Sequence, residues 1–182
     1  MTDITNLSTV NVAISNYIAV VTMNNPPVNA QNRQFHDDLT LAFDVLSDRN
    51  DVRSIVLTGA GKCFSAGADI KGRASQESDL GDHWVHSRRV RECFYSIMEC
   101  RKPVIAAING AALGAGLAVA ASADILIASE SASVGLPEIN VGLLGGGRHA
   151  MRLFGHSKTR RLMLTGQRLS GAELYRLGIV EE

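Results

Sequence analysis

The chain has 182 residues, enough for one domain with a substantial hydrophobic core. Its 18 basic and 18 acidic residues give a formal net charge of zero, which argues against a dedicated nucleic-acid binder or membrane-surface protein. The N-terminus has no basic segment followed by an apolar one, so we expect no signal peptide. The cysteines have neither CxxC nor metal-ligand spacing, which favours reduced thiols, a cytoplasmic location and no metal site.

The first fifty residues predict a β-hairpin followed by a helix. Val10–Ile14 and Ile18–Thr22 alternate apolar residues with others, which is typical of strands. Ser15–Asn16 between them predicts the turn, and Pro26–Pro27 ends the second strand. Beyond Asn32, apolar residues at helical spacing predict a helix of about 16 residues.

A glycine-rich turn after a buried strand is the most informative part of the chain. Ser54–Leu57 is a short apolar run typical of a parallel strand, and Thr58–Gly61 is expected to break it. In Phe64–Lys71, three small residues at 66–68 leave backbone N–H groups open to a ligand. Asp69 then suits the N-cap of a helix. An N–H in such a turn is suited to one half of an oxyanion hole, but an ordinary strand-to-helix turn has the same pattern.

The second half of the chain predicts alternating strands and helices. Strands are expected at Val104–Ile108, Asp124–Ala128 and Ser133–Gly135, and helices at about 82–99, 114–121, 146–154, 157–165 and 170–177. The apolar run 104–128 is nearly long enough to cross a membrane, but its polar residues and glycines predict a strand, a loop, a helix and a strand. This rhythm indicates an α/β fold in one domain over residues 1–182.

Three segments, in this order, resemble the crotonase (enoyl-CoA hydratase/isomerase) family. They are F-S-A-G-A-D-I-K at Phe64–Lys71, K-P-V-I-A-A-I-N-G-A-A-L-G-A-G at Lys102–Gly116, and V-G-L-P-E-I at Val134–Ile139. An earlier segment, Val21–Ala30, resembles the family's first CoA-binding segment. The resemblance runs from about residue 10 to 180. It implies a crotonase-like α/β spiral of ββα units, with the C-terminal trimerisation helices truncated or absent, in a homotrimer or a dimer of trimers.

The resemblance also implies the chemistry and the residues that perform it. The substrate is expected to be an acyl-CoA thioester, with coenzyme A as part of the substrate and no permanently bound cofactor. The N–H groups of Ala68 and Ala115 are expected to form the oxyanion hole, and Glu138 to act as acid and base. Because Glu138 follows a proline among apolar neighbours, we expect a raised pKa. The expected CoA-binding residues are Val28, Ala30, Ala66, Ala68, Asp69, Ile70, Lys71, Leu113 and Gly114.

Departures from the family pattern narrow the expected reaction. Family hydratases with two glutamates carry a second acid where this chain has Ala118, and a methyl group cannot hold water. A single glutamate is typical of enoyl-CoA isomerases and of some hydratases of aryl or branched substrates. Where relatives often read P-G-A-G-G-T-Q, this chain has Gly145–Met151 with Arg148 and His149. These two side chains either reach the acyl pocket or cap and solvate a helix.

Other interpretations remain beside the enzyme. One is a CoA-ester-binding protein without turnover, favoured by the missing second acid at Ala118. Another is a dinucleotide-binding domain, prompted by Gly59 and Gly61, but Phe64 stands where its fingerprint needs a third glycine. Arg88, Arg89 and Arg91 form a small basic cluster. A solvated helix face explains it more simply than a contact with phosphate or nucleic acid.

Overall fold

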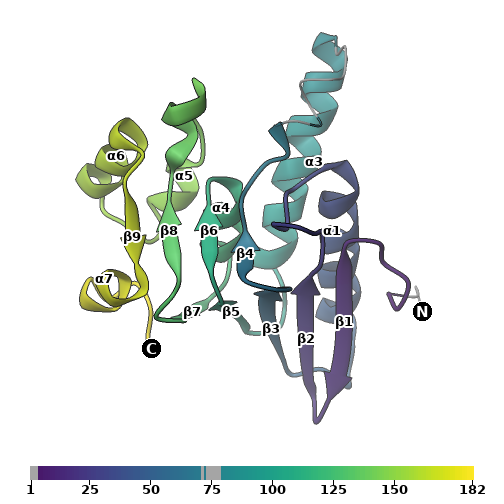
Figure 1. The fold of residues 1–182 in the computed structure, drawn as a ribbon. Helices are drawn as coiled ribbons and strands as arrows, with labels where there is room; N and C mark the ends of the chain where they lie inside the picture. The colour runs from purple at the N-terminus through teal and green to yellow at the C-terminus, as the bar shows by residue number, and fades with distance from the viewer. Residues whose placement is uncertain (1–3, 71, 73–78) are drawn as a thin grey trace.

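The computed structural model describes residues 4–70, 72 and 79–182. Its fold is mixed α/β, with two sheets and helices packed against them (Figure 1), which confirms the predicted class. The five-stranded sheet has the order β1 (Val10–Ser15), β2 (Ile18–Met23), β3 (Ser54–Gly59), β5 (Val104–Ile108), β7 (Ile125–Ala128). The four-stranded sheet has the order β4 (Cys63–Ser65), β6 (Ala111–Leu113), β8 (Ser133–Gly135), β9 (Arg168–Ser170). The helices are α1 (Arg33–Asp48), α3 (Leu80–Met98), α4 (Ala115–Ala120), the 3-10 helix η1 (Pro137–Val141), α5 (Gly147–Ala150), α6 (His156–Thr165) and α7 (Gly171–Arg176).

The chain repeats a strand–strand–helix unit. β3, β4 and α3 form one unit, β5, β6 and α4 the next, and β7, β8 and α5 the third. Each unit gives its first strand to the five-stranded sheet and its second to the four-stranded sheet. β2, β3, β5 and β7 run parallel, as do β4, β6 and β8. The carboxyl ends of β4 and β6 therefore lie side by side, next to the start of α4.

The β1–β2 hairpin turns one residue later than predicted. Asn16 and Tyr17 form the turn, both with positive φ, at 49° and 66°. Two-residue turns with positive φ match the twist of the strands that they join. The Arg53 guanidinium lies 4.3 Å from the centre of the Tyr17 ring, so this turn is also braced by a cation–π contact.

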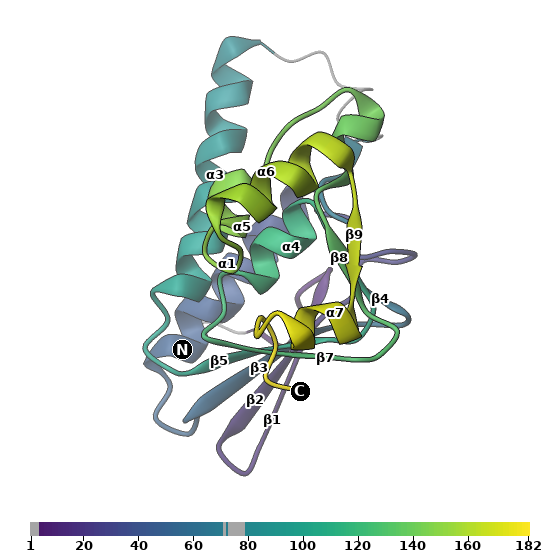
Figure 2. The same ribbon diagram turned by 90° about the vertical axis from the view of Figure 1, so that its left-hand side faces the viewer.

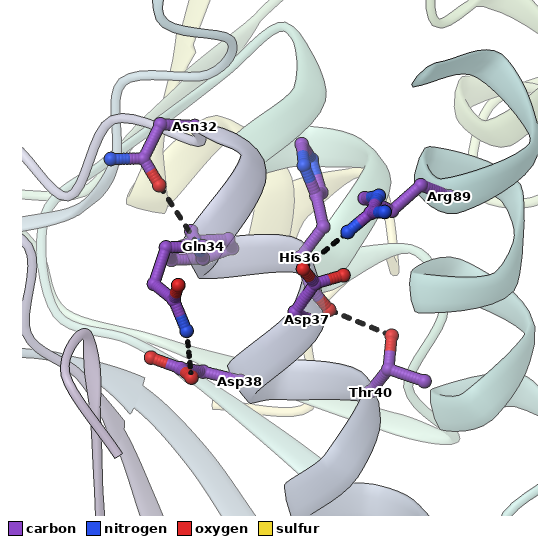
Figure 3. Close-up of polar contacts among 8 residues, drawn as sticks. Asn32, Gln34, His36, Asp37, Asp38, Thr40 and Arg89 are labelled. Carbon is purple, nitrogen blue, oxygen red and sulfur yellow. Dashed lines mark hydrogen bonds and ion pairs between the residues drawn. The ribbon is translucent and has the colours of Figure 1, made fainter. Parts of the chain in front are cut away.

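Helices α1 and α3 pack together over the five-stranded sheet (Figures 1 and 2). The Asn32 side chain accepts a hydrogen bond from the Phe35 N–H, as expected of the N-cap of α1 (Figure 3). An ion pair between Arg89 and Asp37 links the two helices, and Arg91 pairs with Glu92. Arg89 and Arg91 of the basic cluster therefore form ion pairs with acidic side chains of the same chain.

Helix α3 begins two residues earlier than predicted. The Asp79 carboxylate accepts a hydrogen bond from the Asp82 N–H, so Asp79 is the N-cap. The buried residues of α3 lie only in the last third of the helix, at Cys93, Phe94 and Ile97. Both ribbon views show the N-terminal end of α3 extending past the rest of the molecule (Figures 1 and 2). The predicted loop between Gly72 and Gly81 falls mostly outside the described residues.

The prediction that strand β3 breaks at Thr58 is wrong. The strand continues through Thr58 and Gly59, where a Cβ would stand only 2.2 Å from the Cys63 carbonyl oxygen. Gly59 therefore serves close packing of β3 on β4, and it is the last residue of the strand. The apolar run 104–128 forms β5, β6, α4 and β7, so its expected loop contains a short strand. Within the part of the chain that the structure describes, no helix is both long and apolar enough to cross a membrane.

We predict that Asn29→Ala strongly destabilises the fold. Asn29 is 2% exposed, has a φ of 52°, and donates from Nδ2 to the carbonyl oxygens of Ala60, Cys63 and Phe64. Alanine removes the donor and tolerates positive φ poorly, so the free energy of unfolding should fall by about 2–4 kcal/mol. Urea unfolding measures the loss. Exposed Asn50→Ala is the control, with an expected change below about 0.5 kcal/mol, and an equal loss in the two variants would contradict the assignment.

Candidate active site

The first loop of the candidate site is held by a neighbouring extended segment. Residues 28–31 run beside residues 66–69, with Gln31 and Ala68 paired in a parallel bridge. Three backbone hydrogen bonds join them: Ala66 N–H to Val28 O at 3.0 Å, Gln31 N–H to Gly67 O at 2.8 Å, and Asp69 N–H to Gln31 O at 3.1 Å. The structure thus brings together two segments that the sequence analysis assigned separately to coenzyme A.

These bonds fix the direction of the Ala68 N–H. The Gly67 carbonyl accepts its hydrogen bond from Gln31, and in a trans peptide the next N–H points the opposite way. The Ala68 N–H is therefore directed away from segment 28–31. The strand on the other side of β4 is β6, so this N–H faces the end of β6.

The second N–H, of Ala115, begins helix α4 close to the first loop. The Gly114 carbonyl accepts from the Ala118 N–H at 3.1 Å within the helix, so the Ala115 N–H points out of the helix start. Gly67 has a φ of 94°, and a Cβ on it would stand 2.6 Å from Leu113 O and 3.2 Å from Ala115 N. The two loops meet with no room for a side chain between them. The absence of a side chain at Gly67 therefore serves this contact between the two loops.

Glu138 lies against the same spot. It stands in η1, after Pro137 at the first position. Its Oε1 would be 2.6 Å from a Cβ on Gly114, so the carboxylate rests on the bare α-carbon just before Ala115. Its Oε2 is buried and has no hydrogen-bond partner among the described residues. Burial raises the pKa of Glu138 above its ordinary value, in the direction that the sequence predicted.

The remaining candidate residues differ in how accessible they are. Val28, Ala66, Ala68 and Ile70 are exposed, Ala30, Asp69 and Ala115 are half-buried, and Leu113 and Gly114 are buried. Asp69 Oδ1 accepts from the Gly72 N–H at 2.9 Å, the contact expected of an N-cap. Lys71 lies outside the described residues.

Arg148 and His149 have different surroundings. Arg148 is exposed. His149 is half-buried and meets the Phe94 ring of α3 edge-on, with 4.6 Å between ring centres. Burial, and then the charges of Arg152 and Arg148, lower the pKa of the His149 imidazole. His149 therefore packs α5 against α3, a role that the sequence analysis did not consider.

A buried polar network beneath the first loop was also missed. Ser65 Oγ donates to Asn29 O at 2.8 Å and accepts from Gln31 Nε2 at 3.1 Å and from Gly67 N at 3.3 Å. All four residues are buried. The only signal in the sequence was the presence of polar side chains inside segments otherwise made of small or apolar residues.

A groove between α1 and α3 is a poor alternative site for an anionic ligand. Three carboxylates line it, those of Asp44, Glu92 and Glu99. Burial, followed by the charges of Asp48 and Glu92, raises the pKa of Asp44, so negative charge is already crowded there. Phosphate groups are repelled by such a lining. Among the described residues, no group of three or more histidine, cysteine or acidic side chains is arranged to hold a metal ion.

Comparison with known proteins gives one consistent family. A sequence model described as Enoyl-CoA hydratase/isomerase matches residues 13–182. A probable enoyl-CoA hydratase of Bacillus subtilis is 38% identical over 177 residues, which cover 96% of this chain and 68% of that protein. The (7aS)-7a-methyl-1,5-dioxo-2,3,5,6,7,7a-hexahydro-1H-indene-carboxyl-CoA hydrolase of Mycobacterium tuberculosis is 36% identical over 166 residues, covering 91% of this chain and 66% of that protein. The structure of DspI from Pseudomonas aeruginosa matches with a TM-score of 0.87 and 35% identity, covering 95% of this chain and 72% of that one. The chain spans about two thirds of the length of these curated relatives.

We predict that Glu138→Gln stabilises the fold at neutral pH. Because the folded-state pKa of Glu138 is raised, the unfolded chain loses this proton first as pH rises, and wild-type stability falls between the ordinary and the raised pKa. Glutamine has no proton to lose, so the variant should be the more stable protein at pH 7. The side chain is only half-buried, so we expect a gain below about 1 kcal/mol.

Urea unfolding at several pH values between 4 and 7 measures this difference. It should shrink toward zero as the pH falls below the ordinary carboxyl pKa of about 4.3. Glu130→Gln, which removes an exposed carboxylate, is the control for the substitution itself. A difference that does not change with pH would rule out a raised pKa at Glu138.

Proposed function

The chain belongs to the enoyl-CoA hydratase/isomerase family, and on that premise we propose that it is an enzyme acting on an acyl-CoA thioester with Glu138 as its single acid and base. The N–H groups of Ala68 and Ala115 stabilise the enolate that forms from the thioester. Coenzyme A is part of the substrate. The preferred reaction is the movement of a proton between two carbons, that is, isomerisation of an enoyl-CoA.

One observation carries the proposal. The Glu138 carboxylate rests on the α-carbon of Gly114, and the next residue, Ala115, presents its N–H at the start of α4. A proton carrier and a donor suited to a negative oxygen are therefore within one residue of each other. Gly67 lies against Ala115 from the other side and precedes the Ala68 N–H.

The two N–H groups supply electrostatic stabilisation. Loss of an α-proton moves negative charge onto the thioester oxygen, and donors fixed before the reaction stabilise that charge without reorganising. Each such donor is typically worth about 3 kcal/mol. Hydrogen bonds hold the carbonyl of each peptide, at Gly67 and at Gly114, so the N–H directions are set before a substrate binds.

Glu138 moves the proton. Its raised pKa lies closer to neutrality, so it can take a proton and return it. Ala118 is 2% exposed, one turn into α4, and its methyl group offers nothing to orient water. With one titrating group, returning the same proton to another carbon is simpler than adding water. This favours isomerisation over hydration.

A CoA-ester-binding protein without turnover is the alternative that a specific observation favours. Ala118 removes the second acid, and the same pocket then binds a thioester without processing it. Turnover measured with a panel of 2-enoyl and 3-enoyl thioesters of coenzyme A separates the two. Binding without any turnover across the panel supports the alternative and contradicts the enzyme.

We predict that Glu138→Gln lowers kcat by 10²–10⁴-fold or more, the typical contribution of general acid–base catalysis. Glutamine keeps the size of the side chain but carries no proton to transfer, so affinity for the thioester should change little. Steady-state kinetics and calorimetric binding measure the two quantities. Glu130→Gln should leave both unchanged. If Glu138→Gln keeps kcat within threefold on every active substrate, the single-glutamate mechanism is wrong.

We also propose that the protein forms a homotrimer, as the family resemblance implied. The support is apolar surface at the end of η1 and just after it, where Val141, Leu143 and Leu144 are 57%, 48% and 63% exposed. Such side chains mark association surfaces when they are contiguous. Light scattering should give three times the 19.5 kDa chain mass, and a monodisperse monomer at micromolar concentration would contradict the proposal.

A further inference from the structure

Gln31 is a buried polar side chain that the mechanism above does not use. It is 2% exposed, and its Nε2 donates to Ser65 Oγ at 3.1 Å. Its Oε1 is buried and has no hydrogen-bond partner among the described residues. A buried amide oxygen without a partner costs stability, so native proteins keep such groups rarely.

Gln31 makes three hydrogen bonds to the Ala68 loop and its base, and in one of them the Gln31 carbonyl accepts from the Asp69 N–H at 3.1 Å. Its backbone N–H donates to Gly67 O, the carbonyl of the peptide that carries the Ala68 N–H. Its side chain holds Ser65 Oγ, which in turn accepts from the Gly67 N–H at 3.3 Å. The peptides before and after Gly67 are thus both restrained through Gln31. Since Gly67 has a φ of 94° and no side chain, these bonds are what restrains its backbone.

We propose that Gln31 is a positioning residue that sets the direction of the Ala68 N–H through Ser65 and Gly67. This inference rests on the proposed function, because it assigns Gln31 to the oxyanion hole. Gln31 touches no reacting atom in this scheme. It acts by narrowing the range of orientations of the 67–68 peptide, which places the donor before charge develops on the thioester oxygen.

No other polar group in the network depends on the Gln31 amide for its only hydrogen bond. Without it, Ser65 Oγ still donates to Asn29 O and accepts from the Gly67 N–H. No other described group loses its only partner, and the unpaired Oε1 disappears. A structural role and a positioning role therefore predict opposite effects on stability when the amide is replaced by an apolar group of similar length.

Gln31→Met tests the proposal. Methionine is similar in length and keeps the backbone hydrogen bond, so Tm should stay unchanged or rise by up to about 4 °C, while kcat falls about tenfold with little change in KM. Gln34→Met is the matched control, three residues further on. Gln34 is exposed, and its side chain donates to Asp38 Oδ1 at 2.8 Å within α1 (Figure 3). It should leave kcat unchanged.

A spectroscopic probe separates positioning from other losses of rate. An aryl-enoyl-CoA thioester absorbs at longer wavelength when its carbonyl is polarised, so the shift on binding reports the oxyanion hole directly. We expect a shift with the wild type, an equal shift with Gln34→Met, and less than half that shift with Gln31→Met at saturating probe. Retention of the full shift, or a fall in Tm that matches the fall in kcat, overturns the positioning role.

The outcome with the wild type distinguishes this inference from the proposed function. If the wild type binds the probe without a shift, or does not bind it, the proposed function fails and the inference fails with it. If the wild type shifts the probe and Gln31→Met shifts it equally, the inference alone fails.

Discussion

The close approach of backbone to backbone around β4 is the constraint on which the candidate site depends. A Cβ would stand 2.2 Å from Cys63 O if placed on Gly59, 2.1 Å from Lys62 O on Gly110, and 2.1 Å from Ser65 O on Gly116. These glycines come from the end of β3, the segment between β5 and β6, and the first turn of α4. Any side chain at one of them would push an element away from β4. Only at this spacing does the loop after β4 touch the start of α4.

Buried polar atoms without hydrogen-bond partners occur on three of the residues discussed above. Glu138 Oε2, Gln31 Oε1 and His149 Nδ1 are buried without a hydrogen-bond partner among the described residues. The Glu138 carboxylate packs against the α-carbon of Gly114. A Cβ placed on Gly146, the residue just before α5, would stand 3.9 Å from Glu138 Oε1. Buried groups of this kind lower stability, and proteins retain them where function requires it. The unpaired Glu138 Oε2 is the atom of this kind whose side chain packs against Gly114 in the proposed site.

The sequence predicted the five-stranded sheet far better than the four-stranded one. β2, β3, β5 and β7 are apolar runs with clear boundaries, and all were expected. β4, β6 and β9 have three residues each, too few to establish a period, and were missed, although the equally short β8 was expected at Ser133–Gly135. Of the site, Glu138 and the two N–H groups came from family motifs. The Gln31–Ser65 network was not predictable, because hydrogen bonds between residues 34 positions apart leave no local pattern.

In the proposed mechanism, the first turn of α4 bears on which reaction the site favours. Leu117, Ala118 and Val119 are all buried, so the helix presents only apolar groups beyond its N–H. Hydration requires a water molecule to be oriented, which a second acid assists, whereas moving a proton between carbons requires one group with a pKa that allows both exchange steps. Glu138, half-buried and raised in pKa, meets the second requirement. In the proposed mechanism, Ala118 is the residue that bears on the choice between the two reactions, because its methyl group leaves proton transfer to Glu138 alone.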